Sequence, residues 1–312
     1  MKSKVMTQKS SCTVVMYHYV RPIQESFYPE IKGREFEDFK SQLNYIKSNY
    51  KIICLSEYVA YLRGEIKINQ ENICVLTFDD GLREHYDYVL PELLREKIIG
   101  TFFIPTLPLE ESIVLDVHKT HFLLASVATE ELIRELMGTL EKEFPERNKI
   151  FTQNPNAVIQ NRFDDLKTAR FKYLLRNMLR TERVAVLKTL FNKYIGVEAD
   201  FAKKLYMGKR ELRSLADNGM EIGSHSHSHE FLPTLSTPEQ EYEIIHSKNV
   251  IEEILEREVT LFSYPNGKLE EKNILQVKDA GYKGAVTVEP RTSSVGDDFF
   301  QIPRLDTNDI SL

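Results

Sequence analysis

Two adjacent carboxylates follow an apolar run in this chain. Residues 73–78 read ICVLTF, and Asp79, Asp80 and Gly81 come directly after them. The carboxyl ends of strands in α/β sheets and barrels carry catalytic groups, so we expect both acids at such an end. One acid of such a pair can bind a metal ion while the other acts as a base. An isolated Asp-Gly pair is also a common turn, so these residues alone leave both interpretations open.

Three of the eight histidines lie within residues 225–229, after another short apolar run. His225 and His229 are four positions apart, a spacing that presents two imidazoles to one ion. The alternative is a solvated histidine-rich loop. Two histidines and one aspartate would leave open positions on a metal ion, as a hydrolytic site requires. We expect His227 to point elsewhere and to have a structural role.

The elements that position these residues follow an alternating pattern. Short apolar runs predict strands at residues 13–17, 73–78, 101–104, 220–222, 260–262, 284–288 and 300–302. Amphipathic stretches such as residues 36–46 lie between them and predict helices. This alternation predicts parallel strands with helical crossovers, and hence the α/β class. The continuous apolar character of the strands fits a sheet or barrel covered on both faces.

Residues 107–207 depart from this rhythm. They contain few strand signals and several helical segments, at residues 129–144, 164–179 and 181–194. A strand precedes the stretch and the strand pattern resumes after it. We therefore predict one catalytic domain over residues 10–312, with a helical insertion at 107–207.

Composition excludes several classes of protein. The 312 residues are 42% hydrophobic and 28% charged, as in ordinary globular proteins. The net charge of −6 gives no general attraction to nucleic acid, so we predict no nucleic-acid partner. No apolar run approaches the ~18 residues that a membrane span needs, and no secretory signal is visible. We therefore expect a cytoplasmic protein; its oligomeric state is left open.

The three cysteines are odd in number and widely spaced. They include no Cys-x-x-Cys pair, so the sequence predicts neither a disulfide framework nor a cysteine metal site.

Three motifs together resemble a known family. Residues 77–81 (TFDDG), 225–229 (HSHSH) and 262–267 (FSYPNG) resemble the first three motifs of the polysaccharide deacetylases, which are carbohydrate esterase family 4 with the NodB homology domain. The resemblance covers roughly residues 10–106 and 208–306. It implies a distorted (β/α) barrel of the NodB type. It also implies one divalent metal ion and removal of N-acetyl groups from amino sugars.

The resemblance carries over to particular residues. It makes Asp80, His225 and His229 the metal ligands and Asp79 the general base. We expect Zn²⁺, with Co²⁺, Ni²⁺, Fe²⁺ and Mn²⁺ as alternatives. Substrate contacts are expected from Tyr264, Pro265 and Asn266, and the backbone N–H of Tyr264 is expected to hold the oxyanion of the tetrahedral intermediate.

Two departures from the family pattern lead to further predictions. The usual late histidine is missing, because no histidine follows Asp297. An early Met-Tyr-His segment ends at His18 instead and resembles the subgroup that includes biofilm poly-N-acetylglucosamine deacetylases. We therefore predict that His18 is the general acid, although a lone histidine after a strand is more often structural.

The second departure is in the third motif, where Ser263 stands in place of the family's usual arginine. We predict that Arg304 instead reaches the site and orients Asp79 through a charge-assisted hydrogen bond. The alternative is a surface arginine that caps the last strand.

The sequence therefore predicts a metal-dependent hydrolase acting on an N-acetylated amino sugar or glycan precursor. A deformylase or another hydrolase of linear amides is an alternative, because the metal site does not specify the acyl group. A non-catalytic carbohydrate-binding homologue is a second alternative. A metal-storage protein is disfavoured, because one aspartate and two histidines form an open site.

Overall fold

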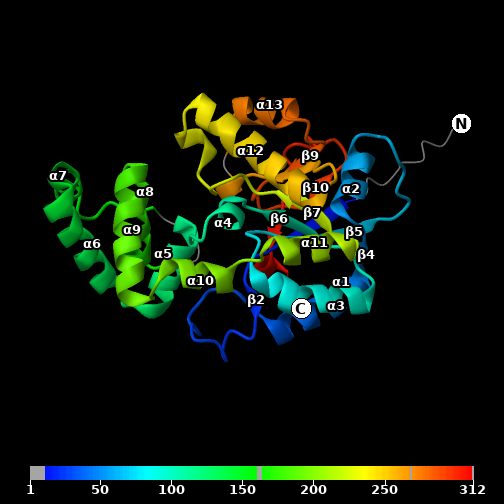
Figure 1. Cartoon of the computed structure of the whole chain (residues 1–312). Coiled ribbons are helices and arrows are strands. Elements are labelled where there is room, and N and C mark those ends of the chain that lie inside the picture. Colours follow the sequence, from blue (N-terminus) through cyan, green and yellow to red (C-terminus); the bar gives the residue numbers. More distant parts are fainter. Residues whose placement is uncertain (1–10, 160–163, 268, 311–312) are drawn as a thin grey trace, which may run out of the picture. The chain divides into compact units, whose positions relative to one another are not determined.

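The structure is a computed structural model that describes residues 11–159, 164–267 and 269–310. Figure 1 shows its elements along the chain. The chain divides into two compact units. The first contains Met1–Pro22, Gly33–Glu111 and Lys204–Leu312, and the second contains Ile23–Lys32 and Ser112–Lys203. The assignment of residues 10–312 to one domain with an insertion at 107–207 stays a prediction.

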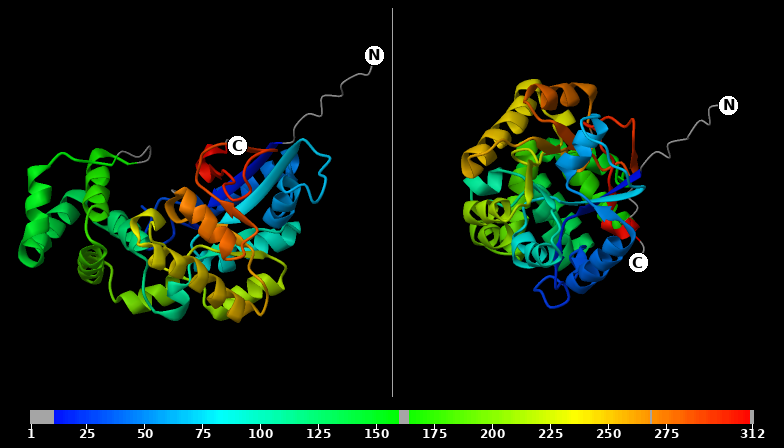
Figure 2. Two further views of the ribbon diagram at one scale, coloured as in Figure 1. Left: turned by 90° about the horizontal axis from the view of Figure 1, so that it is seen from above. Right: turned by 90° about the vertical axis from the view of Figure 1, so that its right-hand side faces the viewer.

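The first unit is built on a mostly parallel sheet that curls into a half-barrel, with helices around it (Figure 2). In spatial order its strands are β10 (Ser293–Ser294), β1 (Ser11–Tyr17), β5 (Asn72–Phe78), β6 (Thr101–Ile104), β7 (Glu221–Ser224), β8 (Leu261–Ser263) and β9 (Gly284–Val286). The short strands β11 (Leu305–Asp306) and β4 (Lys51–Ile52) pair with β1 and β5. β2 (Val20–Arg21) and β3 (Arg34–Glu35) form a separate ribbon. The predicted α/β fold of the NodB type is confirmed.

The predicted strand at residues 300–302 is wrong. Ile302 forms a single bridge with Val286, and no longer strand forms there. The next N–H that faces β9, that of Arg304, donates to the Glu289 carbonyl at 3.1 Å and not to Thr287, so the regular pairing does not continue.

Helices of the first unit pack against the sheet and connect its strands. They are α1 (Phe36–Asn49), α2 (Leu55–Leu62), α3 (Leu90–Glu96), α4 (Leu107–Glu110), α11 (Lys209–Asp217), α12 (Thr237–Leu255) and α13 (Glu271–Asp279). Short helical turns add η1 (His85–Val89), η2 (Leu232–Thr234), η3 (Pro265–Gly267) and η4 (Thr307–Asp309). The predicted helix at residues 36–46 is confirmed as α1, which buries Phe39, Leu43 and Ile46 on one face.

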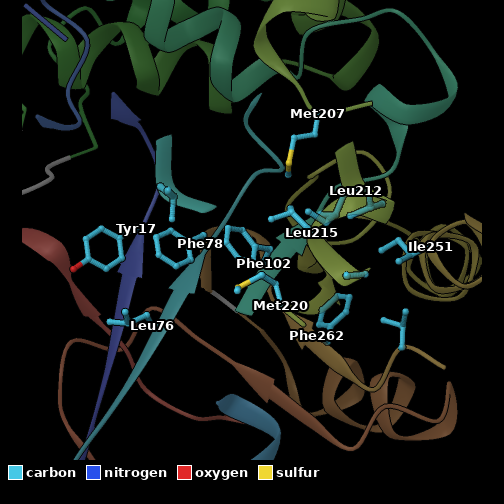
Figure 3. Close-up of a cluster of buried hydrophobic side chains, with 14 of the residues drawn as sticks. Tyr17, Leu76, Phe78, Phe102, Met207, Leu212, Leu215, Met220, Ile251 and Phe262 are labelled. Atoms are coloured by element: carbon cyan, nitrogen blue, oxygen red, sulfur yellow. The ribbon is translucent and has the colours of Figure 1, made fainter. Parts of the chain in front are cut away.

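A row of aromatic rings fills the core next to the strand ends. Tyr17, Phe78 and Phe102 lie in register on β1, β5 and β6 (Figure 3). Their ring centroids are 5.1 Å and 4.8 Å apart, and the rings are nearly parallel. Such pairs contribute about 0.5–1.5 kcal/mol beyond the burial of their area. Because Tyr17 and Phe78 directly precede His18 and Asp79, this packing sets where those two residues leave the sheet.

The second unit is helical and has its own core. Its helices are α5 (Asp116–Ser126), α6 (Thr129–Glu143), α7 (Pro145–Gln153), α8 (Leu166–Arg176) and α9 (Arg180–Tyr194). The boundary between the two units falls within α10 (Glu198–Leu205). Buried side chains such as Leu136, Leu174 and Leu190 pack together inside it. The three helical segments predicted here correspond to α6, α8 and α9.

Within the described ranges, the structure contains no helix with both the length and the apolar character needed to cross a bilayer.

Candidate metal centre and active site

Parallel strands bring several chemistry-bearing residues to one edge of the sheet. β1 ends just before His18, β5 just before Asp79 and Asp80, and β7 just before His225. β1 pairs with β5, and β6 lies between β5 and β7 in the sheet, so the carboxyl ends of these parallel strands share one edge. Arg304 directly precedes β11, which pairs with β1. Segments far apart in the sequence therefore converge there.

Asp80, His225 and His229 form a candidate metal centre. Their ligand atoms all lie within 4.8 Å of one another. Asp80 Oδ1 is 3.5 Å from His225 Nε2 and 3.4 Å from His229 Nε2. Ligand atoms that sit about 2.0–2.1 Å from a tetrahedral Zn²⁺ are about 3.3–3.4 Å apart. The three side chains therefore fit a four-coordinate divalent ion with a position left for water or substrate.

Two of these three ligand residues have unusual backbone conformations. Asp80 has a φ of 79° and His229 a φ of 58°. Residues other than glycine rarely adopt positive φ, and such strain is concentrated at functional sites. The histidine loop, residues 225–229, is held by Glu243, which accepts from the N–H groups of His227 and Ser228 at 2.9 Å and 2.7 Å. These hydrogen bonds hold the backbone of the loop in place.

The tautomer of His225 is set by a backbone contact. Its Nδ1–H donates to the carbonyl oxygen of Ser263 at 2.8 Å. This hydrogen bond leaves Nε2 as the nitrogen that faces Asp80. Metal-binding histidines commonly donate their other N–H in this way, which orients the ring.

Arg304 is buried at the same edge and binds Asp79 with both arms of its guanidinium. Nη1 donates to Asp79 Oδ1 at 2.8 Å, and Nη2 donates to Oδ2 at 2.7 Å. The remaining donors reach Thr77 Oγ1, Ser263 Oγ and the Thr287 carbonyl. Arg304 is only 1% exposed, so it is not a surface cap. The small side chain at position 263 leaves room for this guanidinium where a larger residue would compete with it.

These contacts keep Asp79 ionised. Burial alone would raise the pKa of Asp79, but the guanidinium charge of Arg304 and its hydrogen bonds outweigh it. With smaller electrostatic contributions from the neighbouring histidines, they lower the pKa to about 2. Asp79 is therefore a fully charged carboxylate at neutral pH.

His18 is supported by a histidine that the sequence analysis did not identify. The His85 Nε2–H donates to the His18 carbonyl oxygen at 2.7 Å. Burial lowers the pKa of His85 to about 4, so this ring is neutral at pH 7. Its Nδ1 is buried and has no hydrogen-bond partner among the described residues. In the sequence, only its position five residues after Asp80 indicated that His85 could lie near the site.

The third motif differs from what its residues suggested. The N–H of Tyr264 donates to the Val286 carbonyl at 3.2 Å, so the expected role of this N–H as the oxyanion donor is wrong. The Tyr264 side chain is fully buried and Pro265 is also buried. Asn266 is exposed and has a φ of 56°. Of these three, Asn266 has the side chain that can meet a substrate.

His227 points away from the candidate metal centre, as expected from its neighbours. Its Nδ1 lies 2.9 Å from Thr106 Oγ1 and 3.6 Å from Glu110 Oε2. His246 on α12 is the third member of this group, and its ring centroid lies 4.8 Å from that of His227. Side chains that could bind a metal ion therefore lie on both sides of the histidine loop.

A family model and a curated relative each match part of this chain. The family model for polysaccharide deacetylase matches residues 152–285. The polysaccharide deacetylase homologue YxkH of Bacillus subtilis is 26% identical over 102 residues. That aligned segment spans 33% of this chain and 37% of YxkH, so it covers little more than a third of the relative.

Solved structures share the fold at low identity. The deacetylase PplD of Streptococcus pyogenes, solved in complex with acetate, aligns with a TM-score of 0.61 at 14% identity, over 96% of this chain and 92% of that one. A de-N-acetylase from Aggregatibacter actinomycetemcomitans gives 0.58 at 14% identity, over 95% and 94% of the two chains. IcaB from Ammonifex degensii gives 0.57 at 15% identity, over 96% and 93%. These structures show that the fold is shared, and the family model adds a match to polysaccharide deacetylase over residues 152–285.

Proposed function

We propose that the chain is a metal-dependent hydrolase that removes the N-acetyl group from an acetylated amino sugar or glycan precursor. The family match and the shared fold support carbohydrate deacetylase activity. One observation carries the proposal: the adjacent acids Asp79 and Asp80 have different partners. Asp80 faces two imidazoles, whereas Asp79 is bound by Arg304. This division suits one acid as a metal ligand and the other as a base.

In this proposal Asp80, His225 and His229 hold the ion. A Zn²⁺ ion bound there would polarise the amide carbonyl and lower the pKa of water from about 15.7 toward about 7. Asp79 accepts the proton of the attacking water. Arg304 acts as a positioning residue, because its two-pronged hydrogen bond fixes the direction of both carboxylate oxygens.

His18 donates a proton to the leaving amine. It follows β1 directly, its side chain is half-buried, and Tyr17 just before it lies in register with Phe78 just before Asp79. The carbonyl contact from His85 fixes the backbone from which this side chain projects. An amine is a poor leaving group unless it is protonated, so an acid is required at this step.

The choice of metal ion rests on the chemistry of the three ligands. One carboxylate and two imidazoles suit Zn²⁺, and Co²⁺, Ni²⁺, Fe²⁺ and Mn²⁺ accept the same ligands. Asn266 is proposed as a substrate contact. The cytoplasmic location and membership of the Met-Tyr-His subgroup stay predictions.

A substrate panel tests the proposed function. Protein reconstituted with Zn²⁺ is incubated with N-acetylglucosamine, its oligomers, a nucleotide-linked form and the N-formyl analogues, and released acetate and formate are measured. We expect acetate from at least one N-acetyl sugar. Release of formate alone would show a deformylase. Release from none, with the ion bound in stoichiometric amount, would overturn the proposal and favour a carbohydrate-binding homologue.

Replacing His18 with alanine should lower kcat for amide hydrolysis by about 10²–10⁴-fold, because the leaving amine loses its acid. Metal content should stay at the wild-type value. An activated ester such as p-nitrophenyl acetate provides the control, since its leaving group departs without a proton. His18→Ala should lose much less activity on the ester than on the amide. Equal losses on the two substrates would contradict the assignment of His18 as the acid.

A further inference from the structure

A second group of metal-ligating side chains lies on the other side of the histidine loop. Glu110, His227 and His246 place one ligand atom each within 4.8 Å of one another. Glu110 Oε2 is 2.8 Å from His246 Nε2 and 3.6 Å from His227 Nδ1. The composition is that of the first centre, two imidazoles and one carboxylate, but none of its side chains belongs to that centre.

The backbone around this group is held by several hydrogen bonds. Thr106 N–H donates to the Ser226 carbonyl at 3.3 Å, and Leu107 N–H donates to the His227 carbonyl at 2.9 Å. These contacts join the start of α4, which ends at Glu110, to the histidine loop. The loop is also tied to α12 through Glu243, which accepts from the N–H of His227. The three elements that carry the ligands are therefore fixed relative to one another.

The side chains are also oriented for a shared ligand. The ring of Tyr242 stacks on His246 at a centroid distance of 4.6 Å and an angle of 10°. His227 is about nine-tenths buried, so its ring has a defined position, while Glu110 is exposed. The hydrogen bond between Glu110 and His246 explains why those two side chains meet. The contact between Thr106 Oγ1 and His227 Nδ1 holds the His227 ring so that Nδ1 lies 3.6 Å from the same carboxylate oxygen.

We propose that Glu110, His227 and His246 bind a second divalent transition-metal ion of the Zn²⁺ class. His246 binds the ion through Nε2 and keeps one proton on Nδ1, and any second proton is released to solvent. His227 binds through Nδ1 and carries its proton on Nε2, while Nδ1 gives up its contact with the Thr106 hydroxyl. Three protein ligands with Glu110 exposed leave the remaining positions to water. The inference does not depend on the deacetylase function.

This second ion would link three elements. Glu110 ends α4, His246 lies on α12, and His227 lies between the ligands of the first centre. Occupancy would stabilise the folded state by mass action, because the unfolded chain does not hold these ligands together. It would also stiffen the loop that carries His225 and His229.

Metal stoichiometry tests the inference directly. Metal-free protein is equilibrated with excess Zn²⁺, passed through a desalting column equilibrated in dilute Zn²⁺, and analysed by atomic emission. We expect two ions per chain for the wild type and one for Glu110→Gln and for His246→Gln. Glu111→Gln is the matched control, because it removes the same charge from the neighbouring exposed residue and should still bind two ions. Asp80→Asn should retain the second ion.

A stability measurement gives an independent readout. Added Zn²⁺ should raise the Tm of Asp80→Asn, and this increase should disappear when Glu110→Gln is combined with it. A wild type that binds one ion, with Glu110→Gln and His246→Gln unchanged from it, would overturn the inference. Equal loss in Glu111→Gln and Glu110→Gln would overturn it as well, because it would indicate nonspecific binding. Neither result would bear on acetate release.

Discussion

Replacing Asp79 with asparagine should lower kcat/KM for acetate release by about 10²–10⁴-fold while the metal ion stays bound. Asparagine has nearly the same shape and its oxygen can still accept from Arg304, but it cannot take a proton from water. In the wild type the buried carboxylate is held in its charged form by Arg304. The loss should therefore fall on turnover. The measurement is a steady-state assay with metal content determined on the same sample.

A neighbouring substitution separates the two acids. Asp80→Asn changes the adjacent residue in the same way, but it removes a carboxylate that faces His225 and His229. This variant should lose metal from the first centre together with activity. If Asp79→Asn kept full activity, or if it lost metal as Asp80→Asn does, the assignment of Asp79 as the base would be refuted.

The second large effect concerns stability. Arg304→Met should lower the free energy of unfolding by about 3–5 kcal/mol, because it leaves the Asp79 carboxylate buried without its partner charge. Both oxygens of Asp79 accept from this guanidinium, and both residues are almost completely inaccessible to solvent. Denaturant unfolding of the metal-free proteins measures the difference. A loss near zero would show that Asp79 finds another charged partner.

A double-mutant cycle isolates the pair. Asp79→Asn combined with Arg304→Met removes both charges, so it should cost less than the sum of the two single changes. Arg304→Lys keeps the positive charge but cannot form two parallel hydrogen bonds, so it should recover stability more than activity. Additive effects of Asp79→Asn and Arg304→Met would contradict a direct interaction between the two side chains.

The class of fold could be predicted because its signals are local. Runs such as residues 73–78 are continuous in apolar residues, and the carboxylates that follow mark the end of the strand. The histidines of the first centre come from one short segment, so their proximity to one another needed no knowledge of the fold. Their proximity to Asp80 depends on the order β5-β6-β7, which the family resemblance implied.

The features that could not be predicted depend on long-range pairing. The N–H of Tyr264 seemed available from the sequence, since its residue follows a strand. In the fold the pairing of β8 with β9 extends one residue further, and Val286 accepts that N–H. The contact of His85 with the His18 carbonyl requires β1 and β5 to be neighbours. Neither partner is visible in the sequence around these residues.

His227 illustrates a further limit. Its place between His225 and His229 indicated that its side chain should face away from their ion. In the structure the ring faces Thr106 and Glu110 instead. What it would face depended on two other elements, α4 with Glu110 and α12 with His246, whose sequences carry no metal-binding motif. A single ligand from each of three separated segments leaves no spacing to recognise.

Hydrolysis should require an ion held by Asp80, His225 and His229. The most direct measurement is acetate release by chelator-treated Glu110→Gln protein, which keeps the first centre alone, as Zn²⁺ is added stepwise. We predict no release without metal and a rate that rises to a plateau at one ion per chain. Release at the plateau rate from protein with no detectable metal would contradict the account.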